Sequence, residues 1–204
     1  MGGTKRSLQN VSNSSTNRWI LCTGQPGSGK TTLVRHLCDA LSAEGVTLSG
    51  FYTEEVVGAN GSRIGFDVVT VPDGQRGVLS RKQGLPSSYP KTGAYSVDVA
   101  SFEALALPSI ENAVIPTVHV IDEVGRMELH SAAFQAAVRR LLSDPSSRVI
   151  GAITAPIYGH RVAFCDEIAE ADGVCVRKIT QKTRGGVRDD MLLDARSLAA
   201  RKHC

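Results

Sequence analysis

Eight consecutive residues near the N-terminus, Gly24-Gln-Pro-Gly-Ser-Gly-Lys-Thr31, fit the pattern G-x-x-x-x-G-K-[ST]. Glycines in this pattern let the backbone wrap closely around phosphate groups, and a helix that begins at Lys30 directs the positive end of its dipole at them. We expect Lys30 to reach the β- and γ-phosphates of a nucleoside triphosphate and the Thr31 hydroxyl to bind a magnesium ion. The predicted nucleotide contacts from this loop are Gly24, Gln25, Pro26, Gly27, Ser28, Gly29, Lys30, Thr31 and Thr32.

A second group of chemically capable residues follows about ninety residues later, where an apolar run ends in Asp122 and Glu123. A carboxylate at the C-terminal end of a strand beside a phosphate loop suits a magnesium-bound water, so Asp122 and Thr31 are the predicted metal ligands. Glu123 is then free to act as the general base on the attacking water. The competing interpretation is that Glu123 caps the following turn or pairs with Arg126. The predicted nucleotide contacts from this segment are Ile121, Asp122, Glu123, Val124, Gly125 and Arg126.

Arg126 lies four residues beyond Asp122, on the loop that leaves the strand. A cation there could offset the negative charge that develops as the γ-phosphate is transferred. An ion pair with Glu123 or Glu128 in solvent is an alternative of equal weight. The predicted catalytic residues are Lys30, Glu123 and Arg126.

Other patterns in the chain separate this site from related nucleotide-binding classes. The sequence Asp122-Glu-Val-Gly125 fits the D-x-x-G of GTPases, but Thr180-Gln-Lys-Thr183 ends in Thr and is no N-K-x-D guanine reader. Pro26 interrupts a dinucleotide fingerprint, which disfavours a Rossmann oxidoreductase. Thr154 is either a polar contact for the γ-phosphate or an ordinary strand-end residue. Acids that could support the site from further away are Glu54, Glu55 and Asp67.

The elements that must position these residues follow from hydrophobic periodicity. Short apolar runs alternate with segments of helical period, which predicts an α/β fold with a mostly parallel sheet flanked by helices. Strands are expected at 19–23, 95–99, 118–121, 148–154 and 174–179, and an antiparallel hairpin at 50–57 and 64–71. Helices are expected from Lys30, from Ser101 to Pro108 or shortly beyond, and at 131–142, 161–170 and 188–200. The strand and helix around the glycine loop make an accidental glycine-rich turn the weaker interpretation.

The bulk composition is typical of one globular domain. The chain has 204 residues, of which 42% are hydrophobic and 21% charged, and we expect a domain over residues 18–204 after a disordered tail at 1–17. No apolar run is long enough for a membrane helix or a secretory signal. Five scattered cysteines without a CxxC pair favour a reduced, cytoplasmic protein. A monomer is expected.

The net charge of +3 hides a basic C-terminal segment with eight basic and three acidic residues between Arg177 and Lys202. Such a segment could contact nucleic acid. A solvated helix face is the favoured alternative, because no aromatic residue among these bases could stack on nucleobases.

Several of these segments together resemble the small P-loop nucleoside-triphosphatases first recognised in thermophilic organisms, a family that includes cancer-related nucleoside-triphosphatase. The segments that carry the resemblance are 24–32, 50–56, 63–69, 101–108 and 120–129, in that order. The resemblance implies a RecA-like fold and slow, magnesium-dependent hydrolysis of several nucleoside triphosphates with little base preference. It also implies that residues 122–126 lie close to the nucleotide. Two positions depart from the family pattern: Arg126, where relatives often have Lys, and Thr183-Arg184, where they have Asn-Arg.

The expected function is therefore magnesium-dependent hydrolysis of nucleoside triphosphates to the diphosphate and phosphate. A small kinase remains the alternative, with the basic stretch from Arg177 to Arg188 as its lid. A third hypothesis is a nucleotide-gated protein that holds RNA through the same segment.

Overall fold

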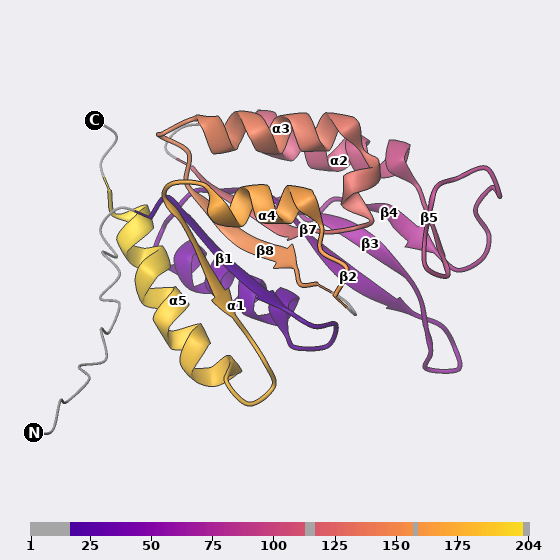
Figure 1. Cartoon of the computed structure of the whole chain (residues 1–204), viewed down its shortest axis with the longest axis horizontal. Coiled ribbons are helices and arrows are strands. Elements are labelled where there is room, and N and C mark those ends of the chain that lie inside the picture. The colour runs from indigo at the N-terminus through magenta and orange to yellow at the C-terminus, as the bar shows by residue number, and fades with distance from the viewer. Residues whose placement is uncertain (1–16, 113–116, 157–158, 202–204) are drawn as a thin grey trace, which may run out of the picture.

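The computed structural model describes residues 17–112, 117–156 and 159–201 (Figure 1). The tail expected at residues 1–17 lies outside this range except for its last residue. Within the described residues the strands form one nine-stranded sheet in the order β5-β6-β4-β3-β2-β7-β8-β1-β9. The strands are β1 Trp19–Gly24, β2 Leu48–Val57, β3 Arg63–Val71, β4 Arg76–Arg81, β5 Lys91–Thr92, β6 Tyr95–Val97, β7 Val118–Val124, β8 Val149–Thr154 and β9 Val174–Lys178.

The sheet has a parallel half and an antiparallel half, and β2 joins them. Strands β2, β7, β8, β1 and β9 run parallel, so their C-terminal ends share one edge of the sheet. Strands β3, β4, β6 and β5 continue the sheet from β2 with antiparallel pairing. Strand β8 lies between β1, which carries the glycine loop, and β7, which carries the two acids. This order confirms the predicted RecA-like architecture with an antiparallel hairpin.

Helices cover both faces of the sheet (Figure 1). Helices α2, α3 and α4 lie on one face, and α1 and α5 lie on the other. Their bounds are α1 Lys30–Ala43, α2 Val99–Glu111, α3 Ala132–Ser143, α4 Ala163–Glu170 and α5 Arg184–Ala199, with a 3₁₀ turn η1 at Glu128–His130. None of the helices in the described residues is long and apolar enough to cross a membrane.

The two-sided core follows from the alternation of side chains along buried strands. In β1, Trp19 and Leu21 point to the cluster under α2, α3 and α4, whereas Ile20 and Cys22 point to the cluster under α1 and α5. The first cluster is centred on three rings packed edge to face, with centroids 5.2–5.7 Å apart: Phe51, Phe102 and Phe134. The second contains the helical series Leu33, Leu37 and Leu41 from α1.

The structure corrects the sequence prediction at several element boundaries. Strands β4 and β5 were not expected, and β7 extends through the two acids to Val124. Helix α2 starts at Val99, because the Asp98 side chain accepts a hydrogen bond from the backbone N–H of Ser101. Helix α5 starts at Arg184 instead of 188. Its first turn contains two glycines, which weakened the helical pattern in the sequence.

Candidate active site

The glycine loop leaves the sheet at the end of β1 and enters α1 at Lys30. Gly27 and Gly29 have φ angles of 76° and 98°, a left-handed conformation that side chains other than glycine rarely adopt. Gly29 occupies the N-cap position of α1, and no side chain caps the helix. The first N–H groups of α1 are therefore left to bind an anion. Gly24 has a packing role as well, since a Cβ there would lie 2.5 Å from the Ile179 carbonyl oxygen.

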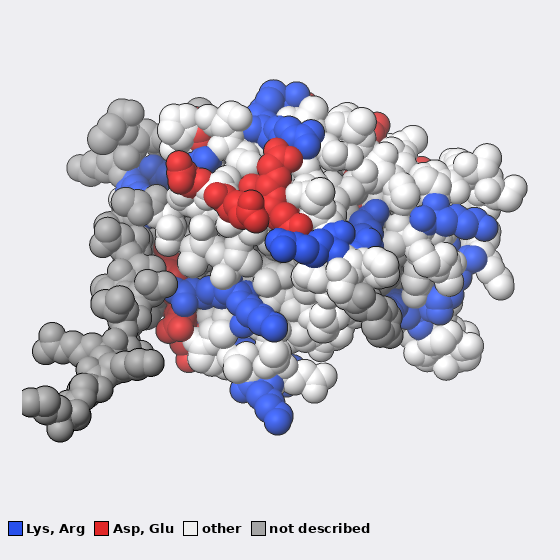
Figure 2. Space-filling model, in the orientation of Figure 1, with Lys and Arg blue, Asp and Glu red and all other residues white. Residues whose placement is uncertain are grey.

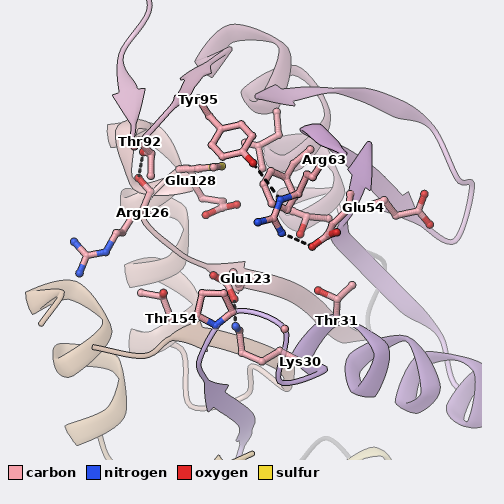
Figure 3. Close-up of a pocket in the computed structure, with 18 of the residues that line it drawn as sticks. Lys30, Thr31, Glu54, Arg63, Thr92, Tyr95, Glu123, Arg126, Glu128 and Thr154 are labelled. Carbon is pink, nitrogen blue, oxygen red and sulfur yellow. Dashed lines mark hydrogen bonds and ion pairs between the residues drawn. The ribbon is translucent and has the colours of Figure 1, made fainter. Parts of the chain in front are cut away.

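Lys30 lies between the loop and the acids of β7. Its Nζ donates a hydrogen bond to the Gly24 carbonyl oxygen at 3.0 Å. The same Nζ forms an ion pair with the Glu123 carboxylate at 3.2 Å. The lysine side chain is only 10% exposed, so its charge is directed inward, toward the position expected for the phosphates (Figure 3).

Asp122 is completely buried at the end of β7, where it pairs in register with Tyr52 of β2. Among the described residues, neither carboxylate oxygen has a hydrogen-bond partner with good geometry. Burial, assisted by the negative charge of Glu123, raises the pKa of Asp122 to about 7, although the nearby Thr31 hydroxyl and Lys30 ammonium oppose the shift. A buried carboxylate without a partner is costly, and a bound cation would remove that cost.

The residues present fit a magnesium ion. No group of three or more His, Cys, Asp or Glu side chains in the described part of the chain could hold a metal by itself. Magnesium needs no such cage, because it commonly binds through one or two protein ligands together with substrate phosphates and water. The Asp122 carboxylate at the end of β7 and the Thr31 hydroxyl at the start of α1 lie next to each other. Together they supply that kind of partial ligand set.

Glu123 and Glu128 place two further carboxylates next to Asp122. A Cβ on Gly125 would lie 2.8 Å from an oxygen of each, so a larger residue there would require both carboxylates to shift. Glu128 is 4% exposed, and its burial, together with the charge of Glu123, raises its pKa to about 8. Glu123 is less buried and faces Lys30. Of the acids at the end of β7, Glu123 is therefore the carboxylate best placed to accept a proton inside the cavity.

In the described part of the chain, Lys30, Thr31, Glu123 and Glu128 border a large cavity of about 1070 Å³, whereas the fully buried Asp122 is not part of its lining. On one side it is lined by the glycine loop and the start of α1, and on the other by residues of β2, β3, β6 and the segment after β7. Thr154, Arg126, His160 and Arg184 also line it. Figure 3 shows Lys30, Thr31, Glu123 and Thr154 around the lower part of the cavity, and Arg63, Tyr95 and Thr92 above them.

Comparison with known proteins identifies the family of this chain. The model of a protein family described as NTPase matches residues 19–192. The chain belongs to this NTPase family. It is 43% identical to human cancer-related nucleoside-triphosphatase over 86% of this chain and 95% of the relative. It is 36% identical to nucleoside-triphosphatase THEP1 of Thermotoga petrophila, over 85% of this chain and 90% of the relative.

Two solved structures of NTPase relatives have the same fold. The solution structure of a human cancer-related nucleoside triphosphatase superimposes with a TM-score of 0.76 at 43% identity, covering 91% of this chain and all of that one. The crystal structure of THEP1 from Aquifex aeolicus gives a TM-score of 0.73 at 33% identity, covering 90% and 99% of the two chains.

The structure brings together most of the residues predicted for the NTPase site. The cavity is lined by Pro26, Gly27, Gly29, Lys30, Thr31, Thr32, Glu123, Arg126 and Thr154. Other predicted contacts have side chains elsewhere: Ile121 and Val124 belong to the hydrophobic core, and Ser28 is buried. Gln25 bonds outward to the Pro156 carbonyl oxygen. Residues of this kind can contribute only backbone groups or support to a nucleotide.

Arg126 lines the cavity, but its partner differs from both expected acids. Its Nη2 donates to the His160 carbonyl oxygen at 2.7 Å, and among the described residues it has no ion pair with Glu123 or Glu128. In Figure 3 its guanidinium points away from Lys30 and Glu123. The alternative of a surface ion pair is therefore not what the structure shows. A catalytic role for Arg126 stays a prediction, and it requires the side chain to turn inward when the nucleotide binds.

The more distant acids have a structural role. Glu54 accepts hydrogen bonds from Arg35 and Arg76, and buried Asp67 pairs with Arg76 and Arg81. This network ties α1 to strands β2, β3 and β4. Glu54 and Glu55 also line the cavity, whereas Asp67 does not.

The basic C-terminal segment forms no separate lid in the described residues. Arg177 is paired with Asp194, Arg188 with Asp189 and Arg196 with Glu44, as expected for a solvated helix face. Arg184 lies beside Gly29 of the phosphate loop and lines the cavity. The sequence reasoning named Arg184 only as a departure from the family pattern, because its distance along the chain from the loop hides this proximity.

Cavity residues that the sequence reasoning missed come mainly from the antiparallel half of the sheet. They include Arg35, Thr53, Arg63, Phe66, Leu79, Thr92, Tyr95 and Met127. These residues form no compact motif, and two of the strands that carry them, β4 and β5, were not predicted. The resemblance of segments 50–56 and 63–69 to the family was the one available signal.

Proposed function

We propose that this protein hydrolyses nucleoside triphosphates to the diphosphate and phosphate, with magnesium as its cofactor and little preference among bases. One observation carries the proposal: the buried Asp122 carboxylate, which has no well-formed hydrogen bond among the described residues, lies beside Thr31 and Glu123 and faces the start of a helix that no side chain caps. The glycine loop alone would support nucleotide binding only. The acids at the end of β7 add the means to hold a metal and to accept a proton.

Binding rests on phosphate contacts. The N–H groups at the start of α1 and the Lys30 ammonium would surround the β- and γ-phosphates. Thr31 and Asp122 would hold magnesium, which supplies positive charge at the phosphate oxygens when bound. The γ-phosphate would then take Lys30 from its ion pair with Glu123, because both anions compete for the same ammonium group.

Chemistry rests on Glu123. In the absence of nucleotide its carboxylate is neutralised by Lys30. Once Lys30 turns to the phosphate, Glu123 is free to accept a proton from a water molecule. The water oxygen then bonds to the γ-phosphorus, the bond from that phosphorus to the bridging oxygen breaks, and the diphosphate leaves with the electron pair. Glu123 later returns the proton to solvent.

The nucleoside is expected to meet few specific contacts. In-line attack places the leaving diphosphate on the side of the γ-phosphate away from Glu123 and β7. That side of the loop faces exposed residues, among them Pro26, Gly27 and Arg184. Exposed contacts discriminate weakly between bases. Water as the acceptor agrees with the names of the relatives, which are called nucleoside-triphosphatases.

The direct test is phosphate release from ATP, GTP, CTP and UTP, each with magnesium and each with excess chelator. We expect release from all four with magnesium, without any added acceptor, and none above background with chelator. Chelator-resistant release at the full rate would contradict the metal assignment. Release that requires an added nucleoside acceptor would contradict hydrolysis as the reaction.

A further inference from the structure

The cavity continues beyond the part that a triphosphate needs. Past Glu123 it opens into a region that we call the attack-side chamber, lined by Arg63, Phe66, Leu79, Thr92, Tyr95 and Met127 (Figure 3). These residues come from β3, β4, β5, β6 and the segment after β7. A water molecule that attacks the γ-phosphate needs only a small volume next to Glu123. The full cavity of about 1070 Å³ is at the upper end of the range for small-molecule sites, so there is room for a second ligand.

The order of strands places this chamber on the side of attack. From the phosphate loop on β1, the sheet passes through β8 and β7 to β2 and β3. The phosphate chain lies at β1, and the general base Glu123 lies on β7. Residues on β3 and β6 therefore lie beyond the γ-phosphate. The nucleoside of the bound triphosphate is expected on the opposite side, toward Arg184. The nucleotide's own base cannot reach the chamber while Lys30 and Thr31 hold its phosphates in this direction.

Aromatic groups shape the chamber. The Phe66 and Tyr95 rings pack edge to face with centroids 5.6 Å apart. The Arg63 guanidinium lies 5.1 Å from the centre of the Phe66 ring, where it presents a flat, weakly hydrated surface. Leu79 and Met127 add apolar surface, and methionine adapts readily to the shape of a ligand. Flat aromatic ligands are bound by surfaces of this kind.

The charge of Arg63, the one charged residue of the chamber lining, is already compensated, whereas the Lys82 ammonium, 5.5 Å from the centre of the Tyr95 ring, has no ion pair among the described residues. Arg63 is held by the Glu55 carboxylate at 2.5 Å and by the Tyr95 hydroxyl at 3.1 Å. Glu54 is shared between Arg35 and Arg76. An anionic ligand that binds Arg63 would have to break its pair with Glu55, whereas an uncharged ligand stacked on the rings would not. The Thr53 hydroxyl on the cavity wall can bond to a polar edge of a ligand, and the Thr92 hydroxyl, whose proton is donated to the Arg126 carbonyl oxygen, can act there only as an acceptor.

The wall of the chamber is hydrogen-bonded to the segment that follows Glu123. The Thr92 hydroxyl is 2.9 Å from Nε2 of His130 and donates to the Arg126 carbonyl oxygen at 3.4 Å. Thr92 also lies in the short hairpin of β5 and β6, opposite Tyr95. A ligand against Tyr95 would therefore lie on an element that contacts the backbone of the segment following Glu123.

We propose that the attack-side chamber binds an uncharged, flat heteroaromatic ligand of the nucleoside class at the same time as the nucleoside triphosphate. The proposal rests on the proposed function only for the direction in which the triphosphate lies. The aromatic pair, the guanidinium and the threonine hydroxyls match a purine or pyrimidine ring with a sugar. The pairing of Arg63 with Glu55 and Tyr95 leaves this guanidinium without a vacant position for a phosphate group.

Equilibrium dialysis with labelled adenosine, guanosine, cytidine and uridine tests the proposal. The protein is first saturated with magnesium and a non-hydrolysable triphosphate analogue, which fills the phosphate loop. We expect at least one nucleoside to bind in addition to the analogue. Tyr95→Ala should weaken that binding at least about tenfold, because a stacking partner is lost. Tyr89→Ala is the matched control, since Tyr89 lies outside the cavity lining, and it should bind as the wild type does.

Nuclear Overhauser contacts from the bound nucleoside to the Phe66 and Tyr95 rings of the wild-type protein give a measurement that needs no variant. The proposal is overturned if no nucleoside binds to the analogue complex, if nucleoside and analogue exclude each other, or if contacts to both rings are missing. Failure of the proposed hydrolysis would be visible separately, as absent phosphate release, and would leave nucleoside binding unaffected.

Discussion

At the scale of single residues, the site depends on three carboxylates with different surroundings. Asp122 is buried with no well-formed hydrogen bond among the described residues, Glu123 is paired with Lys30, and Glu128 is buried nearby. The first therefore suits a metal ion, the second suits proton transfer, and the third is held neutral by its burial near neutral pH. Neighbouring carboxylates in different environments can in this way take different tasks.

Arg126 offers a test of transition-state stabilisation. If its guanidinium turns from the His160 carbonyl to the γ-phosphate, Arg126→Ala should lower kcat at least about tenfold with little change in the nucleotide dissociation constant. Arg126→Lys should retain most activity, because the positive charge matters at this position more than a bidentate hydrogen bond. Steady-state rates and equilibrium binding of both variants check this. An alanine variant with wild-type turnover would leave Arg126 as a structural contact to His160.

The raised pKa of Glu128 predicts how the stability of the protein without ligands depends on pH. An unfolded Glu loses its proton near 4.5, whereas folded Glu128 keeps it to about pH 8. Between these values the folded state binds more protons, so the free energy of unfolding should fall as pH rises. Glu128→Gln should flatten this decline without removing it, since Asp122 contributes in the same direction. Thermal unfolding from pH 5 to 9, without magnesium or nucleotide, measures both slopes.

A control variant for this experiment is Glu170→Gln, because Glu170 is exposed on α4. It should reproduce the wild-type dependence. A Glu128→Gln protein whose melting temperature follows the wild-type curve at every pH would show that Glu128 is ionised in the folded state.

The sequence predicted the site residues that belong to short motifs. Lys30, Thr31, Asp122 and Glu123 were predicted, because a loop and a strand end carry them in fixed spacing. Arg184 was not, since only the folded sheet places it beside Gly29. The same applies to the partners of Asp67 and Glu54. These two acids were named only as groups that could support the site from further away, and they form an ion-pair network across strands.

At the scale of elements, close approach of β7 and β8 positions the acids. Gly151 in β8 faces Ile121 in β7, and a Cβ on Gly151 would lie 2.1 Å from the Ile121 carbonyl oxygen. Gly151→Ala should therefore push β7 outward, destabilise the fold by about 1–3 kcal/mol or more, and displace the neighbouring Asp122. Denaturant unfolding and nucleotide binding measure the two effects.

Gly185→Ala provides the contrast for this prediction. Gly185 lies in the first turn of α5, and nothing is within 4 Å of a Cβ placed there. Alanine should leave stability unchanged or raise it by up to about 1 kcal/mol, through its higher helix propensity. Equal stability of the Gly151 and Gly185 variants would contradict the proposed role of strand spacing.

Element prediction succeeded where hydrophobic periodicity was strong and failed where tertiary contacts decide. The buried strands around Trp19, Val118 and Val149 and the amphipathic α1 were all expected. Strand β4 was missed because Gly77, Ser80 and two arginines interrupt any apolar alternation. It is held by pairing with β3 and by packing of α2, which single-sequence patterns do not contain.

At the scale of the whole molecule, charge is distributed in pairs. On the face shown in Figure 2, acidic side chains gather over α4 with basic ones on either side. Ion pairs join Arg139 to Glu167 and Arg161 to Asp166 across this boundary. Around α4 this face therefore offers no continuous basic surface for nucleic acid, whereas basic side chains on the right of the view have no acidic ones beside them.

The open nucleoside side of the cavity predicts weak discrimination among bases. Dissociation constants of the magnesium complexes of ATP, GTP and CTP should lie within about tenfold of one another, which corresponds to about 1.4 kcal/mol. Titration of each nucleotide under identical salt conditions checks this. Thousandfold selectivity for one base would require specific contacts to its edge and would contradict this prediction.

The measurement that tests the central claim most directly is magnesium-dependent turnover of a saturating triphosphate by Glu123→Gln, with nucleotide binding measured on the same preparation. We expect binding close to that of the wild type and hydrolysis reduced by about 10²- to 10⁴-fold, as for loss of a general base. Lys30→Ala is the comparison, and it should weaken binding and turnover together. Wild-type hydrolysis by Glu123→Gln would contradict the claim that Glu123 activates the attacking water.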